Sequence, residues 1–194
     1  MPQLTRADLY SLEKYAEIRQ KFRAQVIAHK KNRRVPLGEH AALYFEDALT
    51  MQYQVQEMLR IERIFEAKGI QEELDVYNPL VPDGHNWKAT FMVEYDDEAE
   101  RRDALARLVG VEKAVWMRVE GFAPVHPISN EDLDRSSDDK TASVHFMRFE
   151  LTPAMVAAAK SGAAIAAGID HPHLNVSLDP LPEPLRTSLA ADLA

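Results

Sequence analysis

The sequence predicts an α+β protein in which a helical N-terminal part precedes a part that mixes strands and helices. Up to about residue 68, apolar residues recur every three or four positions, whereas from residue 88 they alternate with polar ones. The first period is that of an amphipathic helix and the second that of a half-buried strand. In addition, the order strand–helix–strand occurs twice between residues 88 and 169.

The first predicted helix covers residues 6–31. Thr5 and Asp8 resemble a capping box at its start. A one-sided apolar stripe follows, formed by Leu12, Tyr15, Ile18, Phe22 and Val26. Pro36 and Gly38 come after the helix and permit a turn into the next element.

A second, longer helix is predicted from residue 39 to 68, with Gly69 as its C-terminal cap. Its apolar stripe consists of Ala41, Phe45, Ala48, Met51, Val55, Met58 and Phe65. At 1.5 Å per residue such a helix would be roughly 45 Å long, which is more than a small domain requires. We therefore expect a long antiparallel helical hairpin that packs on the rest of the chain or on a second copy.

The predicted boundary between the two parts lies in residues 78–84. A short helix is expected at residues 71–77, after which Pro79, Pro82 and the Asp83-Gly84 pair exclude regular structure. The chain is thus expected to divide into residues 1–78, the hairpin and short helix, and residues 79–194, an α+β domain with a short C-terminal helix.

The C-terminal part is predicted from an alternation of strands and helices. Strands are expected near residues 88–95, 115–119, 142–151, 163–169 and 174–178, and helices at 96–109, 152–161 and 184–192. A long polar loop is expected at 121–141. Two successive strand–helix–strand units are typical of a ferredoxin-like split βαβ sandwich, which is the predicted fold of this part.

The composition limits the classes of function. Hydrophobic residues make up 46% and charged residues 28% of the 194 positions, as in ordinary globular proteins. Because cysteine is absent, disulfides, thiolate metal sites and a cysteine nucleophile are excluded, which fits a reducing compartment. Since neither a secretory signal nor an apolar run of about 20 residues is visible, the expected location is the cytoplasm, with no membrane partner.

The balance of charge argues against nucleic acid as a partner, because the net charge is −8. Despite the net negative charge, the chain has one basic cluster, which consists of Lys30, Lys31, Arg33 and Arg34. It could hold an anion or an acidic partner. The favoured interpretation is a solvated helix end, where cations complement the helix dipole.

The polar face of the second predicted helix is the first candidate site. Helical spacing places Glu46, Thr50, Gln54, Glu57 and Arg60 on or near one stripe, with Tyr53 and Glu62 beside it. Such a stripe could bind a metal, a cationic group or a partner helix, or it could be a solvated face with intrahelical ion pairs. A di-iron site is excluded, because it needs Glu-x-x-His pairs that neither helix contains.

The second candidate site is the segment that holds Asp170, His171 and His173. These side chains could bind a divalent metal or place an imidazole for proton transfer, with His126 or His145 as a remote further ligand. The structural alternative is that Asp170 caps a turn and the imidazoles bond to the backbone. Glycine-rich phosphate loops, nucleophile elbows and His-Glu-x-x-His motifs are absent from the sequence.

Several motifs together resemble an uncharacterised bacterial family of domains of unknown function. They are Phe45-Glu46, residues 53–62, Tyr77-Asn78 with Leu80 and Pro82, residues 89–95, residues 168–172, and Arg186, Leu189 and Asp192-Leu193. Genes of that family often lie beside genes for rubrerythrin-like and iron–sulfur oxidoreductase-like proteins. The resemblance implies a bacterial cytoplasmic accessory to redox or oxidative-stress proteins, and it adds Tyr77 and Asn78 to the candidate partner-binding residues.

Two hypotheses about function follow. The first is a non-catalytic binding or assembly protein that associates with itself, and with a protein partner, through the helical hairpin. The second is a metal-dependent or histidine-assisted enzyme that acts on a small molecule through Asp170, His171 and His173. A pocket that brings Glu57 or Arg60 to Asp170 and His171 would favour the enzyme, and a scattered arrangement would favour the binding protein.

Overall fold

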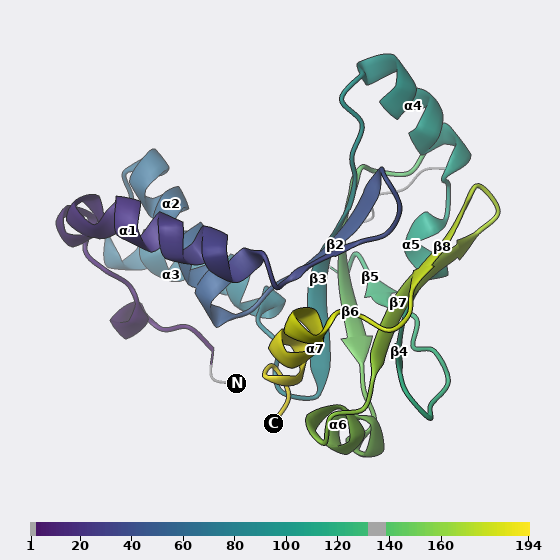
Figure 1. Ribbon diagram of the computed structural model, residues 1–194. Coiled ribbons are helices and arrows are strands. Elements are labelled where there is room, and N and C mark those ends of the chain that lie inside the picture. The colour runs from purple at the N-terminus through teal and green to yellow at the C-terminus, as the bar shows by residue number, and fades with distance from the viewer. Residues whose placement is uncertain (1–2, 132–138) are drawn as a thin grey trace.

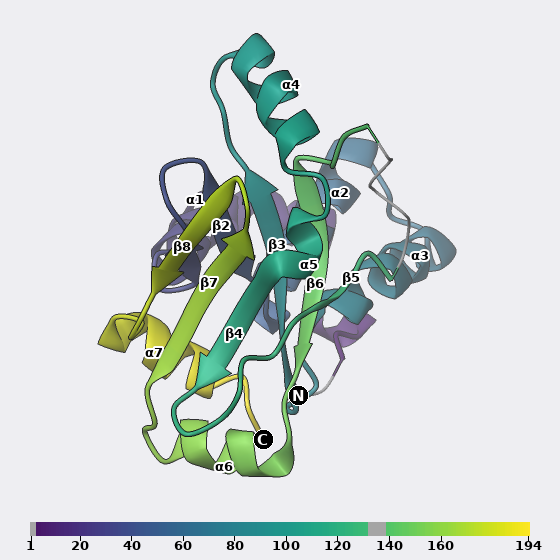
Figure 2. The same cartoon turned by 90° about the vertical axis from the view of Figure 1, so that its right-hand side faces the viewer.

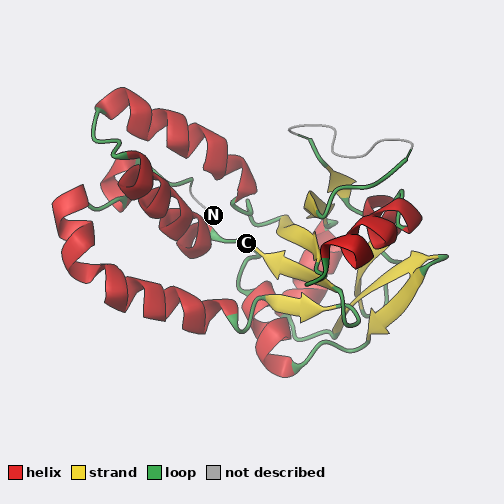
Figure 3. Ribbon diagram, turned by 90° about the horizontal axis from the view of Figure 1, so that it is seen from above, coloured by secondary structure: helices red, strands yellow, loops and turns green. Residues whose placement is uncertain are grey.

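The protein consists of a helical arm and a body of two antiparallel sheets (Figure 1). The structure is a computed structural model and describes residues 3–131 and 139–194. Seen from above, the arm helices lie on one side of the molecule and the strands on the other (Figure 3). The α+β class predicted from the sequence is therefore confirmed.

The arm contains three helices and two short 3-10 turns. Their bounds are η1 (Arg6–Asp8), α1 (Leu12–Lys30), α2 (Ala48–Glu62), α3 (Ala67–Tyr77) and η2 (Asn78–Leu80). Helix α1 packs on α2 through Tyr15, Phe22 and Val26, whereas α3 packs on the opposite side of α2 around Val55, Leu59 and Leu74. The predicted helix at residues 6–31 is confirmed apart from its first turn.

The prediction of one helix over residues 39–68 is wrong. Residues Ala41–Phe45 form strand β2, and α2 begins only after Asp47, whose carboxylate accepts a hydrogen bond from the Thr50 backbone N–H. The helix ends at Arg63, which adopts the left-handed conformation with φ of 55°. Gly69 lies inside α3 and ends no helix. The run Ala-Ala-Leu-Tyr-Phe is almost entirely buried, and a short apolar run fits a buried strand as well as a helix.

The body is built on a five-stranded sheet with the order β1-β2-β3-β6-β5. Its strands are β1 (Arg34–Pro36), β2 (Ala41–Phe45), β3 (Asn86–Val93), β6 (Val144–Glu150) and β5 (Ile128–Ser129). A three-stranded sheet faces it, with β4 (Val115–Val119), β7 (Ile165–His171) and β8 (Leu174–Leu178) in the order β4-β7-β8 (Figure 2). The remaining helices are α4 (Glu98–Arg107), α5 (Val111–Ala114), α6 (Pro153–Lys160) and α7 (Glu183–Ala190).

The strand pairing does not confirm a ferredoxin-like topology. The expected pairing of β3 with β6 is present, but β4 pairs with β7 in the second sheet and does not join the first. Each sheet has an apolar face, and the two faces share one core that includes Trp87, Phe91 and Phe149 from the first sheet and Met117 and Ile165 from the second. The same order of elements along the chain is thus compatible with two facing sheets as well as with a single sheet covered by helices.

The chain passes between the arm and the body three times. After α1 the chain enters the sheet as β1 and β2, returns to the arm for α2 and α3, and re-enters the sheet at β3 (Figure 1). Strand β2 pairs with β3, which belongs to the other side of the predicted boundary at residue 78. The division into residues 1–78 and 79–194 stays a prediction, since these two strands connect its parts.

Arg33 joins the arm, the sheet and the C-terminus. Its side chain is 2% exposed and donates to the backbone carbonyls of Phe45 and Glu46, at 3.0 Å each. The guanidinium also donates to both carboxylate oxygens of Asp192, at 3.2 and 2.6 Å, and Nε lies 3.3 Å from the carboxylate of Asp47. The predicted solvated helix end is therefore wrong for Arg33, although Lys30 and Lys31 are exposed.

The charges around Arg33 affect one another. Burial raises the pKa of Asp192 to about 6, against the opposing effect of Arg33. Asp47 has a lowered pKa, because Arg33, the Thr50 N–H and His29 outweigh its own burial. His29 Nε2 lies 2.5 Å from Asp47 Oδ2, so the end of α1 is bonded to the start of α2.

Replacement of Asp192 tests this connection. We expect Asp192→Ala to lower the free energy of unfolding by about 3–5 kcal/mol, because the variant leaves a buried guanidinium without its main counter-charge. Urea denaturation followed by circular dichroism measures the change. Asp170→Ala is the control, since Asp170 is exposed and its loss should change stability by about 0.5 kcal/mol or less. Equal denaturation midpoints for the two variants would contradict the role of Asp192.

Candidate functional site

Glu57, on the predicted polar face, is bound within the arm. Its carboxylate accepts hydrogen bonds from Tyr15 Oη at 2.6 Å, from Arg19 Nε and Nη2 at 2.7 and 2.8 Å, and from Arg60 Nη2 at 3.2 Å. The Arg19 hydrogen bond, together with those of Tyr15 and Arg60, lowers the pKa of Glu57 to about 2. Burial and the neighbouring carboxylate raise the pKa of Tyr15 well above its usual value. This part of the candidate site therefore fastens α1 to α2.

The other residues of the polar face do not form one site with Glu57. Glu46 is buried and accepts hydrogen bonds from the hydroxyls of Thr50, at 2.7 Å, and Thr90, at 2.9 Å, which joins the start of α2 to β3. Gln54 is half-buried on α2, and Glu62 is exposed at the end of that helix. Because Glu62 is exposed, its charge is solvated and needs no buried partner.

Tyr77 and Asn78 differ in their surroundings. Asn78 bonds to the backbone of Leu4, with Leu4 N–H donating to Oδ1 at 2.8 Å and Nδ2 donating to the Leu4 carbonyl at 2.9 Å. It therefore holds the N-terminal segment on the arm. Tyr77, in contrast, lines a cavity between α3 and the sheet. Of these two predicted partner-binding residues, Tyr77 is therefore the one beside which a ligand has room.

The segment that holds Asp170, His171 and His173 is the end of strand β7 and the tight turn into β8. His171 is buried, and its Nε2 lies 3.1 Å from the carbonyl of Val109, so this nitrogen carries the proton. Its Nδ1 accepts a hydrogen bond from the backbone N–H of His173 at 3.2 Å. Both ring nitrogens are thus engaged with the backbone, as in the structural alternative.

The structure offers no ligand set for the predicted divalent metal at Asp170, His171 and His173. Within residues 3–131 and 139–194, no three His, Asp or Glu side chains lie where they could hold a metal ion. His173 is exposed in the turn and lines a small hollow of about 290 Å³ with His40, Tyr95 and Arg107. Glu57 and Arg60 belong to the arm, far from β7 (Figure 1), so the two candidate groups are not brought together.

Two larger cavities adjoin the arm. One, of about 660 Å³, is the arm-tip groove, lined by Arg6, Ala7, Leu9, Tyr10, Ser11, Leu12, Glu13, Leu59, Ile64, Phe65 and Ile70. The other, of about 590 Å³, is the junction pocket, lined by Asp75, Val76, Tyr77, Pro79, Leu80, Lys88, Glu131, Phe146, Met147 and Arg148. Sequence reasoning overlooked both because each combines segments that are distant along the chain.

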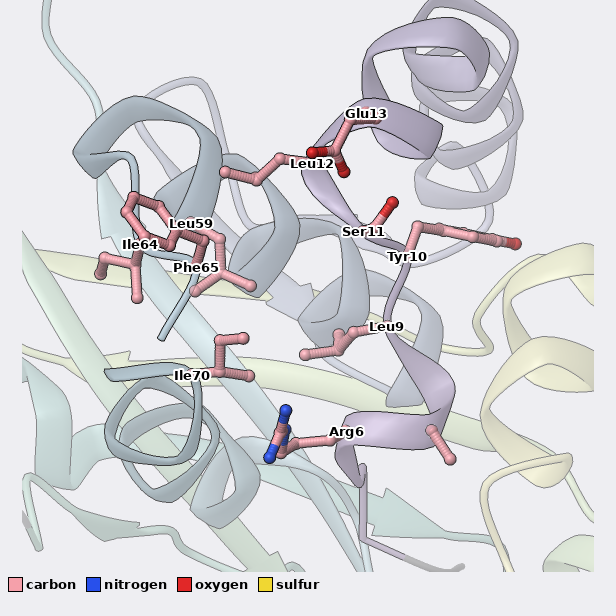
Figure 4. A pocket seen from close by; sticks show the side chains of 11 residues that line it. Arg6, Leu9, Tyr10, Ser11, Leu12, Glu13, Leu59, Ile64, Phe65 and Ile70 are labelled. Carbon is pink, nitrogen blue, oxygen red and sulfur yellow. The ribbon is translucent and has the colours of Figure 1, made fainter. Parts of the chain in front are cut away.

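The arm-tip groove lies between the segment before α1 and the loop that joins α2 to α3. In Figure 4, Leu9 and Leu12 project from one side toward Ile64, Phe65 and Ile70 on the other. Arg6 and Glu13 lie at opposite ends. Phe65 is 74% exposed, although the sequence placed it in the buried stripe of a continuous helix. The left-handed turn at Arg63 ends that helix, so Phe65 does not continue the buried stripe.

The pH dependence of stability tests the bonding of Glu57. Its folded pKa of about 2 lies below the usual value of 4.5, so its contribution is present above pH 4.5 and is lost as the pH falls toward 2. We expect wild type to be more stable than Glu57→Gln at pH 7, with the difference shrinking over this range. Urea denaturation at a series of pH values measures it.

Glu17→Gln is the control for this experiment, because Glu17 pairs with Lys14 on the exposed side of α1. Exposed pairs contribute little, so this variant should follow wild type within about 0.5 kcal/mol at every pH. A difference between wild type and Glu57→Gln that stays constant from pH 7 to pH 2 would contradict the assignment of the charged carboxylate to the arm interface.

None of the helices in the described residues is both long and apolar enough to cross a membrane. No curated protein matches the chain. A solved crystal structure of a protein of unknown function from Burkholderia pseudomallei K96243 is similar over 100% of both chains, with 52% sequence identity and a TM-score of 0.93. A family model described as "Protein of unknown function (DUF3501)" matches residues 3–193. The chain therefore belongs to this family of proteins of unknown function, DUF3501.

Proposed function

We propose that this protein is a non-catalytic binding and assembly protein that forms a two-fold dimer through the arm-tip groove. The observation that carries the proposal is the combination, on one surface, of an apolar hollow and a protruding Phe65. In a two-fold interface the same patch serves both copies, so each Phe65 can enter the groove of the other copy. A second copy of this chain is therefore the occupant we assign to the groove.

The charges of the groove support a second copy in an antiparallel arrangement. Arg6 and Glu13 lie at its opposite ends, and neither forms an ion pair with another described residue (Figure 4). A two-fold axis through the middle of the groove would place Arg6 of one copy beside Glu13 of the other, twice in each dimer. This arrangement also opposes a parallel one, in which like charges would meet.

The shape of the groove is fixed before any partner binds. Gln56, which is fully buried, accepts a hydrogen bond from the Tyr10 N–H at 2.6 Å and donates to the Tyr10 carbonyl at 3.3 Å. Gln52 donates to the Asp8 carbonyl at 2.5 Å. The segment before α1 is thus fastened to α2, and a preorganised surface loses less conformational entropy on binding.

Burial of Phe65 accounts for a substantial part of the free energy such a dimer needs. Full burial of one phenylalanine contributes about 1.5–3 kcal/mol, so two contribute about 3–6 kcal/mol. A micromolar dissociation constant corresponds to about 8 kcal/mol. Leu12, Ile64 and Ile70, together with the two Arg6–Glu13 pairs, supply the remaining contacts in this proposal.

The enzyme hypothesis receives less support from the geometry. The imidazole of His171 is engaged on both nitrogens, and the carboxylates of Glu46 and Glu57 are bonded to neighbouring elements of the same chain. Asp170 and His173 are exposed and lie away from the arm. The candidate residues are thus scattered, which is the arrangement that we expect of a binding protein.

Analytical ultracentrifugation over a wide concentration range tests the dimer. We expect wild type to sediment as a dimer and Phe65→Asp to raise the dissociation constant at least about tenfold, because the variant places a charge in an apolar interface. Ile27→Asp is the matched control, since Ile27 is also an exposed apolar residue of the arm but lies outside the groove. A wild-type protein that stays monomeric at every concentration would rule out the proposal.

Exchange of the two charges distinguishes the proposed arrangement from other dimers. Arg6→Glu and Glu13→Arg should each weaken the dimer, because each places like charges side by side. The double variant Arg6→Glu/Glu13→Arg should restore it toward the wild-type value. Additive weakening in the double variant would mean that Arg6 and Glu13 do not face each other.

The resemblance described above supplies the class of a further partner, a redox or oxidative-stress protein of the bacterial cytoplasm. We expect the purified protein to form a complex with the rubrerythrin-like protein of the same bacterium in size-exclusion chromatography with light scattering. Bovine serum albumin, also acidic, is the control for nonspecific association. Elution of the two proteins as separate species well above micromolar concentration would contradict this partner while leaving the dimer to its own test.

A further inference from the structure

The junction pocket lies where the arm meets the five-stranded sheet. Helix α3 and the turn η2 form one wall, and the face of β3 and β6 that is turned away from the core forms the floor. Most of its lining is apolar, with Val76, Tyr77, Leu80 and Phe146 among the residues. Concave, mainly apolar cavities with a few polar groups are the usual form of small-molecule sites.

Lys88 is the cation on the floor of the pocket that keeps unused hydrogen-bond donors. Strand β3 alternates, so Trp87 and Ala89 enter the core while Lys88 is half-buried on the pocket side. Its Nζ donates to the Pro79 carbonyl at 2.6 Å, and among the described residues it forms no ion pair. An ammonium has three N–H groups, so further donors remain for a ligand.

A second cation lies directly opposite Lys88 but has its own partners. Arg148 on β6 is the cross-strand neighbour of Lys88. Its Nε and Nη2 donate to Glu131 at 2.8 and 2.7 Å, and its Nη1 pairs with Glu150. Like charges in directly opposite positions are unfavourable unless they are neutralised. Glu131 and Glu150 bond to Arg148 and, together with Asp83, also attract the Lys88 ammonium without forming an ion pair with it.

The carboxylates around the pocket each accept at least one hydrogen bond from a donor of the protein. Besides Glu131 and Glu150, Asp75 accepts from Gln71 Nε2 at 2.8 Å, and Asp83 accepts from the His85 N–H at 2.8 Å. Lys88, in contrast, keeps N–H groups that a hydrogen-bond acceptor of a ligand could use. The unused donors of this half-buried ammonium favour a ligand that ends in a carboxylate.

We propose that the junction pocket binds a small organic carboxylate whose body is aromatic or branched and apolar, with the carboxylate on the Lys88 ammonium and the body against Tyr77, Leu80 and Phe146. Burial lowers the pKa of Lys88, and a bound carboxylate would raise it again by stabilising the ammonium. The pocket is separate from the arm-tip groove, so this proposal does not depend on the dimer.

Phenylacetate is the probe, and neutral phenylacetamide, of nearly the same shape, isolates the charge. Isothermal titration calorimetry should show phenylacetate binding wild type at least about tenfold more tightly than phenylacetamide, since a hydrogen bond to a charged group adds about 1.5–3 kcal/mol. Lys88→Met keeps the apolar stem and should remove this preference, whereas Lys88→Arg should retain it. Lys113→Met, at an exposed lysine outside the pocket, should behave as wild type.

Equal affinity of wild type for the acid and the amide, or an unchanged preference in Lys88→Met, would overturn the proposal. So would the absence of phenylacetate binding at about millimolar concentration, where even weak sites fill. Circular dichroism of each variant confirms that it is folded. Repeating the titration with Phe65→Asp separates the two proposals, because loss of the dimer should leave phenylacetate binding unchanged.

Discussion

The guanidinium of Arg33 is shielded from water at the point where the arm, the sheet and the C-terminal helix meet. Its hydrogen bonds reach the end of β2, Glu46 between β2 and α2, and Asp192 after the last helix. A buried charge is costly unless it is paired and fully hydrogen-bonded, so these elements cannot separate independently. Asp47, which lies beside the guanidinium, also caps α2 and bonds to His29 at the end of α1. The orientation of the arm on the sheet, and hence the junction pocket, depends on this one side chain.

The polar residues of the arm serve mainly to hold it together, and the binding surfaces that we propose are formed by residues that carry no recognisable motif in the sequence. Glu57, Tyr15 and Arg19 join α1 to α2, and Asn78 holds the N-terminal segment. The two cavities lie at the ends of this rigid unit, one at the tip and one at the sheet. In the function that we propose, the preformed arm presents a self-association surface and borders a ligand pocket, and neither requires movement of the other.

Much of the local structure could be predicted from the sequence because it rests on period and capping. The strands at Lys88 and Val144, the helix that begins after Thr152, and the β7–β8 pair are all present near the expected residues. The strand at Ala41–Phe45 was missed because five apolar residues have no period that excludes a helix. Sheet order and the Arg33–Asp192 pair, 159 positions apart, depend on contacts that no local pattern contains. Glycine is required at residue 168 because a Cβ there would overlap the indole of Trp116.

The pairing of β2 with β3 has a consequence for any attempt to study the two parts separately. A chain that began at residue 79 would lack β1 and β2, and β3 would change from an interior strand to the border of the sheet. The backbone N–H and C=O groups of β3 that pair with β2 would then face solvent, in a geometry that favours intermolecular strand addition. Insolubility of such a fragment would reflect the loss of a neighbouring strand rather than a failure of the remaining core to fold.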